Sequence, residues 1–140
     1  MASSGISIKW SGWDRIGIAL SGLCIVHCLL LPVALAVAPL WSALAAVHDG
    51  FHLVLAVLLV PTTVLAVRSG YRQHRDRGVL GLLSSGLAII VAAALLGHDV
   101  LGDGWGTGLT LIGSVLLIAG HWRNWQRRRA CRVKVASTVA

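Results

Sequence analysis

The sequence contains no glutamate, and its five acidic residues face twelve lysines and arginines in a chain of 140 residues. It also lacks a polar stretch long enough to fold as a separate soluble domain. Its three cysteines are an odd number, which does not make a disulfide framework. Paired intramembrane carboxylates, a Ser/His/Asp constellation and a phosphate-binding loop are likewise missing. We therefore expect a protein that is not an enzyme and has no resident cofactor.

Apolar residues dominate what remains, since 56% of the chain is hydrophobic and the mean hydropathy is +0.81. A membrane-spanning helix needs about 20 mostly apolar residues, and the chain supplies roughly four such runs. The sequence predicts an all-α polytopic membrane protein, a single membrane domain over residues 1–140. The predicted helices cover about 13–40, 51–67, 79–96 and 106–122, followed by a basic tail over 123–140.

The N-terminal apolar run follows Lys9 and Arg15, as in a signal peptide. The run is too long for one, and its small-residue site at Ala36-Val37-Ala38 is followed by Pro39. We therefore expect this segment to be a membrane anchor.

The positive charges predict the orientation, because cytoplasmic flanks of membrane helices retain lysine and arginine. They precede or begin the first predicted helix, separate the second from the third, or follow the fourth. The other two loops instead contain Asp49, Asp99 and Asp103. Both termini are thus predicted to be cytoplasmic, which requires an even number of spans. Topology also explains the isoelectric point near 10.7, so we expect the lipid bilayer as a partner and no nucleic acid.

Two cysteines lie one helical turn apart in the first predicted helix. On an α-helix, Cys24 and Cys28 share a face with their Cβ atoms about 5–6 Å apart, wider than the roughly 3.5–4.5 Å of a disulfide. A large soft ion between two sulfurs tolerates this gap. Thiolates select soft or borderline metals, of which mercury(II), with its near-linear dithiolate coordination, is the softest common candidate.

His27 lies beside this pair, where it is predicted to be a third ligand or an acceptor of a thiol proton. Pro32 cannot donate an N–H to the carbonyl of Cys28, which favours a kink beside the site. Two cysteines on one face, an intramembrane histidine and a proline together favour a functional site over ordinary packing, because ionisable groups at membrane depth are functional candidates. Cys24, Cys28 and His27 are the primary predicted metal ligands.

Three further residues are weaker candidates for metal binding. His48 and His52, four residues apart at the outer end of the second predicted helix, suit a loose vestibule that collects metal ions, although polar residues that merely end a span fit the same pattern. Cys131 in the basic tail would receive an ion by thiol exchange if its pKa were lowered. His74 and His121 are interpreted as structural.

Three segments carry a recognisable pattern: Asp14-x-x-Gly17 with Ser21-x-x-Cys24-x-x-His27-Cys28 and Pro32; Gly70-Tyr71-Arg72-x-His74-Arg75; and Gly113-Ser114 with His121-x-x-Asn124. In these segments the chain resembles the MerC family of mercuric transport proteins. The resemblance implies a multi-pass protein of the bacterial inner membrane that takes mercury(II) from the periplasmic side. It also implies release of the ion to cytoplasmic thiols, for reduction by a mercuric reductase.

Alternatives remain at this point. The transported or bound ion could instead be copper, zinc or cadmium, or the chain could be a non-catalytic accessory protein whose motif serves only packing. Four short helices form only a thin wall around an ion pathway, so a homo-oligomer also stays open as an alternative.

Overall fold

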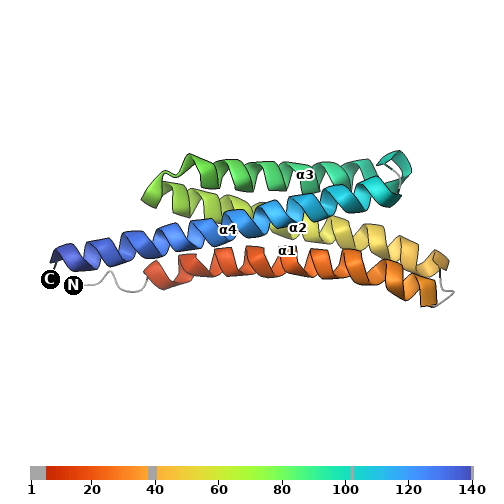
Figure 1. The fold of residues 1–140 in the computed structure, drawn as a ribbon, viewed down its shortest axis with the longest axis horizontal. Helices are drawn as coiled ribbons and strands as arrows, with labels where there is room; N and C mark the ends of the chain where they lie inside the picture. Colours follow the sequence, from red (N-terminus) through yellow and green to blue (C-terminus); the bar gives the residue numbers. More distant parts are fainter. Residues whose placement is uncertain (1–5, 38–40, 102, 140) are drawn as a thin grey trace.

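The computed structural model describes residues 6–37, 41–101 and 103–139, and within these ranges every residue except Arg75 and Asp76 is α-helical. Side chains are described over 12–30, 33–34, 50–96, 100 and 104–138. Figure 1 shows an elongated bundle of long, roughly antiparallel helices. They are α1 (Ile6–Val37), α2 (Trp41–His74), α3 (Arg77–Leu101) and α4 (Asp103–Val139).

All four helices are long and apolar enough to cross a membrane, over Gly12–Leu30, Gly50–His74, Arg77–Leu96 and Gly104–Thr138. This confirms the predicted all-α protein with four membrane-spanning helices.

The helices extend beyond the apolar runs that predicted them. Residues 41–50, the loop expected between the first two spans, lie inside α2, and the basic segment after residue 122 continues α4 to Val139. Hydropathy identifies the part of a helix that suits lipid, whereas backbone hydrogen bonding continues into polar sequence where no proline or turn stops it.

The helix α4 packs against each of the other three, while α1 and α3 lie on opposite sides of the bundle. The start of α1, the α2–α3 turn and the end of α4 share one end (Figure 1). The lysines and arginines therefore gather at this end, which we call the basic end.

The bundle is apolar outside and partly polar inside. Leu29, Leu30 and Val57 are more than half exposed, which suits side chains that face lipid. A buried apolar cluster does hold the helices together, formed by Ala56, Leu59, Val79, Leu83, Ile90 and Leu117. Among the described residues, the remaining interior also contains an aspartate, a histidine, an asparagine, an arginine, two serines, three threonines and two cysteines. Such an interior is expected where membrane helices carry function.

The helices α3 and α4 approach closely at two glycines. A Cβ atom on Gly86 would lie 3.0 Å from the backbone oxygen of Gly113, and one on Gly113 would lie 2.7 Å from Ile90 Cγ1. Small residues at helix crossings let backbones approach in membranes, where dispersion forces drive much of the association. This contact fixes how α4 faces the rest of the bundle.

The α2–α3 turn is built by two consecutive residues. Arg75 has a positive φ of 48°, which reverses the chain after α2. The Asp76 Oδ1 atom then accepts hydrogen bonds from the backbone N–H groups of Gly78 (2.8 Å) and Val79 (3.3 Å), as an N-cap does. Its Oδ2 atom pairs with Arg123 at 3.2 Å and Arg127 at 3.0 Å. The turn is thereby attached to α4.

Stability should depend on the ionisation of Asp76. Partial desolvation raises the pKa of this carboxyl, but the N–H groups of Val79 and Gly78 and the Arg123 guanidinium together lower it below its ordinary value. Its stabilising contribution is therefore complete above the unfolded pKa, about 4, and is lost as the pH falls through the folded pKa. We expect native protein to melt above Asp76→Asn at pH 7, with the difference shrinking on acidification in thermal scans of detergent-solubilised protein. A pH-independent difference would contradict this assignment.

Candidate metal-binding site

One face of α1 is buried and free of large apolar side chains. The residues Asp14, Gly17, Ser21, Cys24 and Cys28 recur at alternating spacings of three and four, and all are buried. This spacing keeps side chains on one helix face. The face is turned toward α2 and α4, both of which pack on α1. It contains two sites: a thiol site at Cys24 and Cys28, and a carboxylate site at Asp14.

At the thiol site, a histidine from α2 contacts both cysteines. Cys24 and Cys28 are 1% and 3% exposed. The His52 Nδ1 atom lies 3.8 Å from the Cys24 sulfur, and its Nε2 atom lies 3.7 Å from the Cys28 sulfur. These three residues offer ligand atoms within 4.8 Å of one another. A metal–sulfur bond of about 2.3 Å, as in zinc sites, places opposite sulfurs about 4.6 Å apart, so the donor set can hold one ion.

The surroundings of the thiol site are mostly apolar. Leu55 is buried against the two cysteines, and Leu20, Phe51 and Leu111 pack around them. The Ser114 hydroxyl on α4 lies near the Cys24 thiol and is buried without a hydrogen-bond partner among the described residues. A low-polarity shell favours a neutral metal dithiolate over a bare dication.

The structure places the other predicted ligands differently. The His27 ring stacks on Phe51, with centroids 4.0 Å apart, and its centroid lies 5.4 Å from that of His52. His27 thus lies at the edge of the thiol site. Cys131 is half-buried on the last turns of α4, outside the thiol site. His48 is also a predicted ligand, but its side chain lies outside those that the structure describes.

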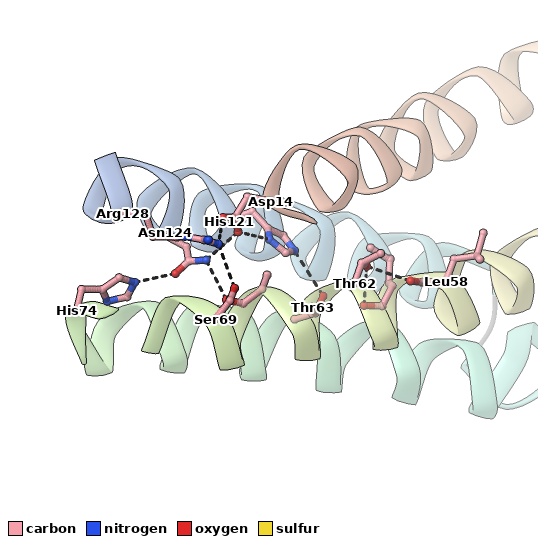
Figure 2. A network of polar contacts seen from close by, with 11 residues as sticks. Asp14, Leu58, Thr62, Thr63, Ser69, His74, His121, Asn124 and Arg128 are labelled. Atoms are coloured by element: carbon pink, nitrogen blue, oxygen red, sulfur yellow. Dashed lines mark hydrogen bonds and ion pairs between the residues drawn. The ribbon is translucent and has the colours of Figure 1, made fainter. Parts of the chain in front are cut away.

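The carboxylate site lies closer to the basic end and joins three helices. Figure 2 shows Asp14 from α1 meeting His121, Asn124 and Arg128 from α4. The Asp14 carboxylate accepts hydrogen bonds from His121 Nδ1 at 3.1 Å, from Asn124 Nδ2 at 2.8 Å and from Arg128 at 3.4 Å. Asp14, His121 and Asn124 are fully buried, and Arg128 is 4% exposed. The negative charge of Asp14 is therefore balanced by a neighbouring guanidinium.

The helix α2 completes the carboxylate site with hydroxyl, backbone and imidazole groups. Thr63 Oγ1 lies 3.4 Å from His121 Nε2, and Ser69 accepts a hydrogen bond from Arg128 at 3.0 Å. The amide of Asn124 donates to the carbonyl of Ala66, and its Oδ1 atom lies 2.8 Å from His74 Nε2 (Figure 2). Every polar atom named here thus has a partner, as buried polar groups require.

Two glycines provide the space for this arrangement. A Cβ atom on Gly17 would clash with the His121 ring, and one on Gly70 would clash with the Asn124 amide. Any larger residue would displace the polar side chain opposite. The carboxylate site therefore explains why aspartate, glycine, histidine and asparagine occur together in the three segments noted in the sequence.

The carboxylate site is not predicted from the sequence, and His52 is predicted only as a weaker candidate for metal binding. The signal for His52 was its position four residues after His48 near the start of a span. Asp14 is the residue that could have indicated the carboxylate site. It is an acidic residue at the edge of an apolar run, and no lysine or arginine lies one turn away on the same face of its helix. Which helix supplies the partner depends on packing, which sequence periodicity does not specify.

Fold and site together define a class of protein: a multi-spanning helical membrane protein with paired thiols buried in its first helix. The family model described as MerC mercury resistance protein matches residues 14–126. The chain belongs to the MerC mercury resistance protein family, which links it to mercury resistance and transport rather than to a known enzyme family. Neither the curated proteins nor the solved structures contain a match.

Proposed function

We propose that this chain carries mercury(II) across the bacterial inner membrane, binding the ion between Cys24 and Cys28 with His52 as a third ligand. The observation that carries the proposal is the convergence of two buried sulfurs and an imidazole from two helices, with ligand atoms within 4.8 Å. Two thiolates neutralise a dication, and thiolates are the ligands that soft metals prefer.

The distribution of charge supports the proposed direction of transport. The basic end carries the arginines of the α2–α3 turn and of the end of α4, so the positive-inside rule assigns it to the cytoplasm. His52 lies near the opposite end of its span, Gly50–His74, and is half-buried. An ion arriving from the periplasm would meet His52 first and then the thiols. Release would follow by exchange with a cytoplasmic thiol acceptor or a mercuric reductase.

The proposal is tested by equilibrium binding of mercury(II) to purified protein carrying Cys131→Ser, which leaves only the pair in α1. We expect one ion per chain, detected by the absorbance of the mercury–thiolate bonds. Absence of binding by this variant would overturn the proposed site.

Replacing His52 with alanine should weaken this binding without abolishing it. Loss of a supporting group at a metal site typically costs about 10- to 100-fold in affinity, and we expect the lower part of that range because two thiolates remain. The measurement is competition against a thiol chelator. His74→Ala is the matched control, since that histidine contacts Asn124 at the carboxylate site; equal affinities of the His52→Ala and native proteins would exclude His52 as a ligand.

The proposed histidine ligand, His52, also favours a second candidate function, the transport of copper or zinc. Imidazole together with thiolate suits copper and zinc as well as mercury. The same binding experiment with these ions as competitors separates the candidates, because a mercury carrier must retain mercury(II) in their excess.

A further inference from the structure

The carboxylate site contains a histidine that packing alone does not explain. His121 is fully buried, and its two ring nitrogens face different groups. Nδ1 lies 3.1 Å from the Asp14 carboxylate, an acceptor, so this nitrogen carries the proton in the neutral ring. Nε2 then has the lone pair and lies 3.4 Å from the Thr63 hydroxyl, which can donate to it. Nε2 is thus the atom at which the ring can bind a second proton.

The charges around His121 are compatible with binding and release of a proton by its ring. Asp14 from α1 and Arg128 from α4 form an ion pair of no net charge beside the ring, while α2 contributes the neutral Thr63 hydroxyl. Between residues 79 and 96, α3 has no titratable side chain. A proton on Nε2 would form an imidazolium whose Nδ1 atom lies 3.1 Å from the Asp14 carboxylate.

A line of hydroxyl groups separates this ring from the thiols. The space over Gly17 is occupied by the His121 ring, with Nε2 the nearest atom to where a Cβ would lie. One turn further along α1 is Ser21, and beside Cys24 is Ser114. Both serine hydroxyls are fully buried, and neither has a nitrogen or oxygen partner among the described residues. Cys24 lies about 10 Å along α1 from Gly17, and Ser21 lies between these two residues on the same buried helix face.

The proposed metal chemistry needs such an acceptor. When a mercury(II) ion binds, two S–H bonds break and two Hg–S bonds form, so two protons leave the sulfurs. We propose that His121, paired with Asp14, is an internal proton-binding site that receives one of these protons through Ser114 and Ser21, while the other proton is released to solvent. This inference rests on the proposed function, since without ion binding at Cys24 and Cys28 there is no proton to move.

The test counts protons released to solvent during ion binding. Purified protein carrying Cys131→Ser is titrated with mercuric chloride in buffers of different ionisation enthalpy, which gives the protons released per ion. His121→Gln keeps an amide of similar reach but cannot bind the proton, so it should release about one more proton per ion than its parent. Thr62→Val, which removes a neighbouring hydroxyl that bonds only the carbonyls of Leu58 and Leu59 in its own helix, is the matched control and should behave as the parent does.

The possible results separate this inference from the proposed function. Equal proton release by parent and His121→Gln, with ion binding intact in both, would overturn the inference alone. Loss of ion binding in the parent would overturn both. Should His121→Gln fail to fold, ¹⁵N NMR of ring-labelled histidine in the parent decides. The His121 Nε2 signal should move to the protonated range when the ion binds, and an unchanged signal contradicts the proposal.

Discussion

Proteoliposomes containing the Cys24→Ser/Cys28→Ser variant should take up mercury(II) no faster than protein-free vesicles. Serine keeps the size of cysteine but its hydroxyl does not ionise near neutral pH, so the site loses both soft anionic ligands. Each single serine variant should also fail. One remaining thiolate leaves the bound complex with a net positive charge in a mostly apolar shell, where an uncompensated charge costs several kcal/mol. We therefore expect flux above the leak to fall at least roughly 100-fold, equivalent to about 2.8 kcal/mol.

The control for this experiment is Cys131→Ser, which changes the thiol outside the thiol site. Its flux should stay near the native level when the vesicles contain a small thiol as acceptor. Circular dichroism should show equal helicity in all variants, because no cysteine forms a disulfide among the described residues. Native flux in the double variant would refute a transport role for the pair.

Replacing Asp14 with alanine should be the most destabilising single change at the carboxylate site. The substitution removes the acceptor of three hydrogen bonds from α4, and Arg128 stays buried without that carboxylate. Breaking a buried ion pair by deleting one partner costs about 3–5 kcal/mol. We expect a loss of about 3 kcal/mol in the free energy of unfolding, measured by titration with sodium dodecyl sulfate in mixed micelles.

Two comparisons sharpen this prediction. Asp14→Asn retains a hydrogen-bond acceptor and should lose less stability than the alanine variant. Arg127→Gln breaks an ion pair that is largely exposed on the arginine side, and exposed pairs contribute little. A loss no larger for Asp14→Ala than for Arg127→Gln would show that the buried pair does not hold α1 against α4.

The sequence predicts the architecture well because lipid imposes a simple rule. A span must be about 20 apolar residues long, and the four apolar runs satisfy it, so their number and approximate centres follow directly. Helix ends do not follow, since the polar residues from 123 onward continue α4 without altering its backbone geometry. The orientation of the termini relative to the membrane stays a prediction from charge.

The candidate site is likewise only partly predictable from the sequence. The spacing of Cys24 and Cys28 is local, so one helical turn is enough to predict that they share a face. The contact of His52 with both sulfurs depends on how α2 is rotated against α1, and the partners of Asp14 are more than 100 residues away in α4. Such contacts are set by packing at positions such as Gly17 and Gly70, where the absence of a side chain matters as much as the presence of its partner.

The continuous helix α4 limits how an ion can leave. At about 1.5 Å per residue, Cys131 lies about 26 Å along the helix axis from Ser114, the neighbour of Cys24. A straight helix does not fold back, so the two thiols cannot share an ion within one chain while α4 stays intact. If the chain carries mercury(II) as proposed, transfer to Cys131 would require either a diffusible thiol acceptor that reaches the α1 pair or a second subunit.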